Sequence, residues 1–284
     1  MDAKTIAKTA LRSLGSAVRP DAGSRVVVLC YHSVHPSLPF RSVTPAQFSA
    51  HLSWLSEHCD CIPFGDVLSA HRRERGRPIV AITFDDGYAD NHEFALPALV
   101  ERRIAATFFL TAGFIERDQL AIERFRRLRR IDPELIRPLE WAQVQEMSAA
   151  GMTIGAHTQT HPNLATLPPS KLAYELQHSK EVIEDRLRHS VTMLAYPFGR
   201  PRVHVTAEVL EAARRAGYEV AASVAGRGVR PADAPLSVPR IFVANDTVET
   251  LREKVLGVWD LIESVRERMP LAVARAVSPA DFDV

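Results

Sequence analysis

Short apolar runs alternate along this chain with longer segments whose apolar residues recur at helical spacing. Runs rich in Val, Ile, Ala and Phe are typical of strands buried on both faces of a parallel sheet. They lie at residues 25–32, 78–85, 105–110, 152–157, 191–196, 218–224 and 238–243. The segments between them predict helices at residues 64–73, 91–103, 169–188 and 203–216, with others starting at Thr44, ending at Gly151 and starting at Thr247.

The order of these elements is that of an α/β protein. Strands separated by helices predict parallel pairing with right-handed crossovers. About seven strands without an internal repeat or a low-complexity linker indicate a single (β/α) barrel, and an open doubly wound sheet is the alternative. We expect a basic helical extension at residues 1–24, one domain at 25–270 and a C-terminal tail at 271–284. The terminal helix should cover the domain with one apolar stripe, formed by Leu251, Val255, Leu261, Ile262 and Val265.

Composition, charge and cysteine content indicate which partners and which cellular compartment to expect. The chain has 284 residues, is 46% hydrophobic and carries a formal charge of +1, so no nucleic-acid partner is expected. Its cysteines, Cys30, Cys59 and Cys61, form no Cys-x-x-Cys pair and are read as small apolar residues in a reducing compartment. Without an export signal or membrane span, a cytoplasmic location is expected. The extension at 1–24 could make a weak contact with an anionic membrane surface, or be an ordinary solvated or docking helix.

Two adjacent carboxylates end one of the apolar runs. Asp85 and Asp86 belong to the sequence Thr-Phe-Asp-Asp-Gly at residues 83–87. Burying two carboxylates is costly unless a metal, a cation or a reaction requires them. The alternative is a simple turn in which the carboxylates bind backbone and Gly87 takes a positive φ.

Histidines follow two other strands. His157 and His161 are four residues apart directly after one strand, a spacing that lets both imidazoles face one ion, and His32 ends the first strand. With one carboxylate they would form a two-histidine, one-carboxylate site; the alternative is a pair of surface histidines in a polar loop. Because Thr158 follows the first histidine, this is not the His-Glu-x-x-His helix of metalloproteases. The strongly basic stretch at 123–130 could attract phosphate or an anionic lipid, or form a solvated helix face.

These motifs resemble a known family. Residues 83–87, 157–161 and the Pro-Phe-Gly turn at 197–199 are similar to the first three motifs of the polysaccharide deacetylases, the NodB-homology group or carbohydrate esterase family four. The resemblance covers residues 26–243 and implies a distorted seven-stranded NodB-type barrel. It also implies that Asp86, His157 and His161 hold a divalent metal, with zinc as the expected ion, and that Asp85 is the general base.

The remaining roles follow from a circularly permuted branch of that family, which includes poly-N-acetylglucosamine deacetylases. The usual arginine of the third motif is replaced by Ala195, and the usual late acid histidine is missing, since no histidine follows His204. The Tyr-His-Ser sequence around His32 resembles the first strand of this branch and makes His32 the candidate general acid. Its alternative role is that of a histidine that only hydrogen-bonds at the barrel mouth. Arg240 is the candidate replacement arginine, holding Asp85 ionised, unless it forms a surface salt bridge.

The resemblance also implies where the substrate oxygen lies and what the reaction is. Backbone near Phe198, with its neighbours Tyr196 and Gly199, is expected to meet the oxyanion. The expected activity is metal-dependent removal of N-acetyl groups from an N-acetylated saccharide, by hydrolysis of a carbon–nitrogen bond. The alternatives are a deacylase of a lipid-linked or nucleotide-linked sugar, with a glycolipid substrate, and a catalytically silent carbohydrate-binding barrel.

Overall fold

A computed structural model describes residues 25–37, 41–70, 76–129 and 137–268 of the chain. The expected extension at 1–24 and tail at 271–284 lie outside the described residues. In the part of the chain that is described, no helix is long and apolar enough to cross a membrane.

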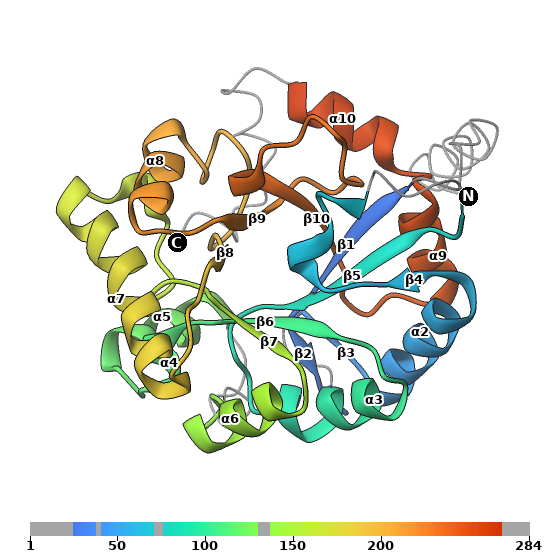
Figure 1. The fold of residues 1–284 in the computed structure, drawn as a ribbon, viewed down its shortest axis with the longest axis horizontal. Coiled ribbons are helices and arrows are strands. Elements are labelled where there is room, and N and C mark those ends of the chain that lie inside the picture. The colour runs from blue at the N-terminus through green and yellow to red at the C-terminus, as the bar shows by residue number, and fades with distance from the viewer. Residues whose placement is uncertain (1–24, 38–40, 71–75, 130–136, 269–284) are drawn as a thin grey trace.

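Seven parallel strands close into a barrel (Figure 1). In spatial order they are β1 (Val26–Tyr31), β10 (Val238–Phe242), β9 (Val220–Val224), β8 (Met193–Ala195), β7 (Thr153–Ala156), β6 (Ala106–Leu110) and β5 (Ile79–Phe84). Pairing of β1 with β5 over their whole length closes the ring, so the barrel is confirmed and the open sheet is wrong. The short strand β4 (Asp60–Cys61) pairs with the start of β5, and β2 (Ser33–Val34) pairs with β3 (Ser42–Val43) beside the barrel.

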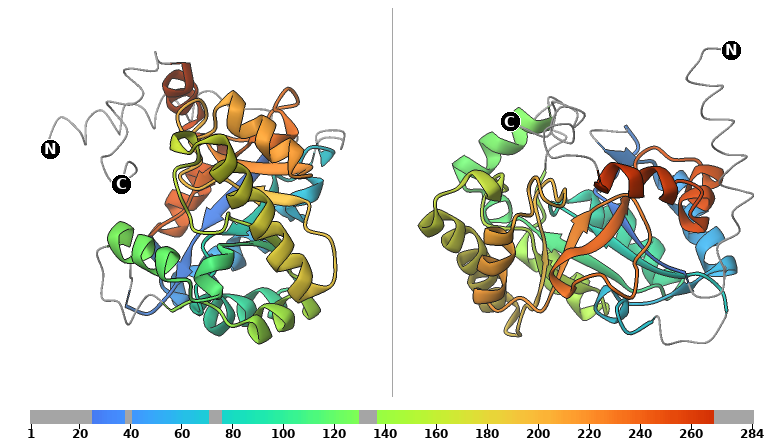
Figure 2. Two further views of the ribbon diagram at one scale, coloured as in Figure 1. Left: turned by 90° about the vertical axis from the view of Figure 1, so that its left-hand side faces the viewer. Right: turned by 90° about the horizontal axis from the view of Figure 1, so that it is seen from above.

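Helices form an outer layer around the strands, as the two further views in Figure 2 show. They are α2 (Pro45–His58), α3 (Leu96–Glu101), α4 (Ala112–Ile115), α5 (Gln119–Arg129), α6 (Trp141–Ala149), α7 (Pro169–Leu187), α8 (Ala207–Arg215), α9 (Val248–Leu256) and α10 (Asp260–Arg268). A π-helical turn at Asn91–Ala95 precedes α3. The start of α2 follows the sequence closely, because the Thr44 hydroxyl accepts the Gln47 N–H and Pro45 occupies the first helical position.

Two expected helices are shorter than the apolar spacing indicated. Of the helix expected at 64–73, the residues described there, 64–70, form 3-10 and other turns, including a 3-10 turn at Phe64–Asp66, and no α-helix. The helix expected from Val203 begins at Ala207, because the Thr206 hydroxyl accepts the Val209 N–H and so caps the helix four residues later.

The prediction of a single terminal helix is also wrong, because Gly257 divides this segment into α9 and α10. Gly257 has a φ of +81° and ends α9 in the left-handed conformation that glycine adopts most readily. Leu251 and Val255 on α9 are buried, whereas Leu261 and Val265 on α10 are 68% and 55% exposed. Among the stripe residues whose side chains are described, only the two on α9 are therefore buried.

Alternation along the strands separates the barrel interior from the layer between strands and helices. On β1, Val27 and Leu29 pack in the large core with the helices, whereas Val26 and Val28 belong to a second cluster with Val238 of β10. No described member of this second cluster lies in an α-helix, so we assign it to the barrel interior. Because side chains two residues apart share a face, the interior rows continue at the carboxyl ends of the strands with polar residues.

Candidate active site

The interior rows of β5 and β10 end in a buried ion pair. The row of β5 runs from Ala81 through Thr83 to Asp85, and that of β10 runs from Val238 to Arg240. Arg240 Nη1 and Nη2 donate to Asp85 Oδ1 and Oδ2 at 2.6 and 2.7 Å. Arg240 also donates to Thr83 Oγ1 at 3.1 Å and is 0% exposed. The surface salt bridge considered for Arg240 is therefore wrong, and the arginine instead lies inside the barrel against Asp85.

The ion pair fixes the charge of Asp85. Burial by itself raises the pKa of this carboxyl, but the charge and hydrogen bonds of Arg240, with a contribution from His157, lower the pKa to about 2. Asp85 is therefore ionised throughout the neutral pH range, and both of its oxygens are held in one orientation.

The adjacent carboxylate, Asp86, reaches its position through an unusual backbone turn. Asp86 and Gly87 both have positive φ, +77° and +90°. The φ of Gly87 favours glycine, and a Cβ there would lie 3.0 Å from Ile115 Cδ1, so the Ile115 side chain would have to shift. Asp86 Oδ1 lies 3.6 Å from His157 Nε2 and 3.5 Å from His161 Nε2. Gly87 thus has the positive φ expected for a turn, but the Asp85 carboxylate binds Arg240 and the Asp86 carboxylate faces the two histidines, so the sequence is more than a simple turn.

These three side chains fit a divalent metal ion. Their ligand atoms all lie within 4.8 Å of one another, and all three residues are buried. His157 Nδ1 lies 2.7 Å from the Ala195 carbonyl oxygen, which places the proton on Nδ1 and leaves the Nε2 lone pair directed at Asp86 and His161. Two imidazole nitrogens and one carboxylate oxygen are a donor set that suits zinc and related first-row ions.

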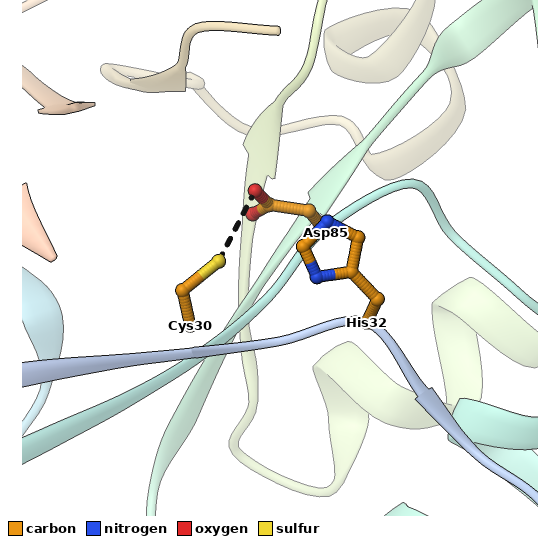
Figure 3. A group of neighbouring side chains, drawn as sticks. All are labelled: Cys30, His32 and Asp85. Atoms are coloured by element: carbon orange, nitrogen blue, oxygen red, sulfur yellow. Dashed lines mark hydrogen bonds between the residues drawn. The ribbon is translucent and has the colours of Figure 1, made fainter. Parts of the chain in front are cut away.

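Cys30 of β1 and His32, which directly follows β1, lie beside Asp85 (Figure 3). Cys30 and His32 are two residues apart, so both point into the barrel, and their side chains lie around the Asp85 carboxylate. The Cys30 thiol donates to Asp85 Oδ2 at 3.5 Å, and burial raises the pKa of this thiol well above its usual value. His32 is 7% exposed and its ring packs edge-on against Phe242. Because the Arg240 cation already binds both oxygens of Asp85, a second metal ion at this group is disfavoured.

The backbone at His32 is held by buried polar residues that the sequence analysis missed. The Asn91 side-chain amide donates to the His32 carbonyl oxygen at 2.8 Å. Asp90 accepts the Ser33 hydroxyl at 2.5 Å and the Val34 N–H at 3.2 Å, and burial raises the pKa of its carboxyl to about 7. The available signal was an Asp-Asn pair at the start of an otherwise amphipathic helical segment, three residues after the turn at Gly87.

The turn at 197–199 packs beside the histidines. Phe198 has a φ of +62°, and its ring centroid lies 5.2 Å from that of His161. The N–H groups of Tyr196 and Gly199 already donate, to the carbonyl oxygens of Ala222 at 3.2 Å and Pro197 at 2.7 Å. The Tyr196 hydroxyl donates to a backbone carbonyl in the β9–β10 connection. Of the three residues expected near the oxyanion, Phe198 is therefore the remaining candidate for a backbone donor.

Comparison with known proteins places the chain in a family. The family model for polysaccharide deacetylases matches residues 72–221, more than half of the chain. The chain belongs to the polysaccharide deacetylase family. The matched region contains Asp85, Asp86, His157 and His161, but neither His32, directly after the first strand, nor Arg240 on the last strand.

The relatives of this chain include a protein named as a poly-N-acetylglucosamine deacetylase, the kind of enzyme found in the permuted branch. YxkH of Bacillus subtilis is 27% identical over 206 residues, which cover 72% of this chain and 66% of that protein, just under two thirds of its length. A poly-beta-1,6-N-acetyl-D-glucosamine N-deacetylase of Staphylococcus aureus is 25% identical over 230 residues, 77% of this chain and 72% of that protein.

Two solved structures share the fold. The deacetylase PplD of Streptococcus pyogenes, determined with acetate, superposes with a TM-score of 0.68 at 23% identity, covering 82% of this chain and 99% of that one. IcaB of Ammonifex degensii gives a TM-score of 0.67 at 25% identity, covering 83% of this chain and 98% of that one. The seven-stranded barrel of this deacetylase-family chain is therefore the barrel of known deacetylases.

Proposed function

We propose that this chain is a metal-dependent N-deacetylase of an N-acetylglucosamine-containing saccharide. The observation that carries the proposal is the convergence of the metal-binding geometry with an oriented carboxylate: Asp86, His157 and His161 surround one point, and Asp85 lies beside them, 4.0 Å from His157 Nε2. The Staphylococcus aureus relative named for poly-beta-1,6-N-acetyl-D-glucosamine supports the choice of saccharide.

Asp86, His157 and His161 would hold the ion. When bound there, a divalent ion supplies a Lewis acid that acidifies water and polarises an acyl carbonyl. A carboxylate with a pKa of about 2 is a weak base, so Asp85 can take a proton only from a water acidified in this way. Arg240 keeps Asp85 ionised and directs its oxygens.

The other residues handle the acyl oxygen and the leaving group. As the water oxygen bonds to the acyl carbon, Asp85 accepts the water proton and the Phe198 N–H donates to the acyl oxygen. His32, whose ring lies beside the Asp85 carboxylate, then gives a proton to the amide nitrogen as the carbon–nitrogen bond breaks. The products are acetate and the free amino sugar.

Acetate release from a panel of substrates tests the proposal. The panel contains β-1,6-linked and β-1,4-linked N-acetylglucosamine oligomers, a nucleotide-linked N-acetylglucosamine and a glycolipid that carries the same sugar. We expect release from at least one oligomer, loss of release after chelation, and recovery when zinc or cobalt is added back. Saccharide binding without chelator-sensitive release from any member would overturn the proposal and favour a silent binding barrel.

A further inference from the structure

One arginine of the basic helix α5 is directed at the protein instead of the solvent. Arg124 Nη1 donates to the Thr160 carbonyl oxygen at 3.2 Å and also to the Thr160 hydroxyl oxygen. Its side chain is 30% exposed, whereas that of Arg127 on the same helix is 73% exposed and pairs with Glu123. The solvated face expected for this stretch therefore describes Arg127 but not Arg124, which contacts the segment between the two metal-ligand histidines.

A buried glutamate of α7 holds the same segment. Glu175 is 6% exposed, although it lies among the apolar positions of its helix. Its carboxylate accepts the Thr160 N–H at 2.8 Å and the Thr160 hydroxyl at 2.5 Å, and its backbone carbonyl accepts the Gln159 N–H at 3.1 Å. Arg124 lies 3.7 Å from the same carboxylate. A buried carboxylate requires such partners, and here they come from the His157–His161 segment and from α5.

The start of α4 also holds the segment. The Ala112 and Gly113 N–H groups donate to the carbonyl oxygens of Thr158 and Gln159 at 3.2 and 2.8 Å. A Cβ on Gly113 would lie 2.4 Å from the Gln159 oxygen, so only glycine allows this approach. The segment is thus held by backbone contacts from α4 and by Glu175 and Arg124.

The segment needs this support because its backbone is in a disfavoured conformation. Thr158 and His161 have φ values of +67° and +58°, the left-handed region that residues with a Cβ rarely adopt. A segment without external contacts would relax to ordinary φ values and turn the His161 imidazole away from Asp86, which lies 3.5 Å from it. Residues that hold the segment therefore set the geometry of the metal ligands without touching the ion.

We propose that Arg124 and Glu175 are positioning residues that pre-organise His157 and His161 for metal binding. This inference rests on the proposed metal site. Loss of residues that orient metal ligands typically lowers metal affinity about 10- to 100-fold, and we expect a decrease of that size in Arg124→Met and in Glu175→Met. Glu175→Gln keeps one acceptor for the Thr160 N–H but loses the charge that faces Arg124. Its affinity should therefore lie between those of the wild type and Glu175→Met, although Gln and Met are similar in size.

Titration of the metal-free protein with cobalt tests the inference, using the visible absorption of the bound ion and competition with a chelator. Arg127→Met is the matched control, since it removes a neighbouring arginine that does not contact the segment, and its affinity should stay within about twofold of wild type. Arg124→Lys keeps a donor and should recover part of the affinity. If the wild type and all variants bind cobalt equally and with the same spectrum, Arg124 and Glu175 do not position the ligands.

Amide hydrogen exchange of the metal-free protein separates this inference from the metal site itself. Exchange in the peptide that contains Gln159 and Thr160 should be faster in Glu175→Met and Arg124→Met than in the wild type and Arg127→Met. A wild type that binds no divalent ion would overturn the proposed function. Unchanged exchange in both variants would overturn the positioning role, whatever the metal result. Arg124 is partly exposed, so we expect its variants to fold. They keep the test decisive even if the Glu175 variants do not fold.

Discussion

Replacement of Arg240 by methionine tests the electrostatic centre of the site most directly. Methionine keeps the apolar character of the inner part of a side chain that is 0% exposed and lacks the guanidinium group. It removes both hydrogen bonds to Asp85 and the charge that opposes it. Asp85, which is 3% exposed, would then be a buried carboxylate without its counter-charge.

The expected cost at neutral pH is large. Removing one partner of a buried ion pair typically destabilises a protein by about 3–5 kcal/mol, because the other charge remains buried. The lowered pKa of Asp85 reports the net effect of burial, Arg240 and the nearby histidines on this carboxylate. A change from 3.8 to about 2 corresponds to about 2 kcal/mol of stability at neutral pH.

The pH dependence of this loss has a definite sign. In the wild type the folded-state pKa of Asp85 is lowered, so its contribution is complete above the unfolded pKa near 4 and is lost as pH falls towards 2. In Arg240→Met burial dominates, and the pKa of Asp85 rises above its ordinary value. The variant should therefore gain a proton on Asp85 in mildly acidic solution, and its deficit in unfolding free energy should be smaller at pH 4.5 than at pH 7.5.

Urea denaturation at these two pH values, together with the pH–rate profile of acetate release, provides the assay. We expect the acid limb of the profile to move to higher pH in Arg240→Met. The double variant Arg240→Met/Asp85→Asn should be more stable than Arg240→Met, because the unpaired charge is gone. An equal deficit at both pH values, with an unshifted profile, would refute the reasoning.

A second buried arginine offers a matched control. Arg227 is 6% exposed and contacts both oxygens of Asp233 at 2.8 Å, in the connection that leads from β9 to β10. The adjoining Val229 N–H donates to the Val26 carbonyl at the start of β1, the end of the barrel opposite the candidate active site. Arg227→Met should therefore lower stability but leave the pH–rate profile unchanged.

Three further changes test the division of roles. Asp86→Asn should lower metal affinity by at least tenfold, whereas Asp85→Asn should keep the metal and abolish acetate release; equal metal loss in both, by metal analysis after dialysis, would contradict separate roles. His32→Ala should keep the metal and reduce turnover about 10²- to 10⁴-fold, and unchanged turnover would remove His32 from the reaction. Gly87→Ala should lower the unfolding free energy by about 1–3 kcal/mol, because φ is +90° and the new Cβ would crowd Ile115; a variant with wild-type stability in urea would show that this position tolerates a side chain.

The local pattern of the chain determined the elements and most of the site. Continuous apolar runs can be satisfied only in a buried parallel sheet, and parallel strands carry their functional groups at one end. This is why Asp85, Asp86, His157 and His32 could be chosen from their places directly after strands. The break of the terminal helix at Gly257 was visible as a glycine, but an isolated glycine inside a helical pattern does not by itself end a helix.

Long-range contacts were decided only by the tertiary structure. Arg240 and Asp85 are 155 residues apart. The residues around them do not by themselves predict that closure of the barrel places β10 and β5 on either side of β1. The role of Glu175 could not be recognised for the same reason. One acidic residue among the apolar positions of α7 has no evident role until its partners are known.

The pattern of apolar and polar residues along the chain therefore determined which residues lie at the ends of strands, because the spacing of apolar residues is a local property. Which charge faces which depends on the closure and register of the whole barrel. A buried carboxylate is tolerated only where that closure supplies a partner. For this reason the family resemblance could pair Arg240 with Asp85, but the choice between this pair and a surface salt bridge was decided only by the fold.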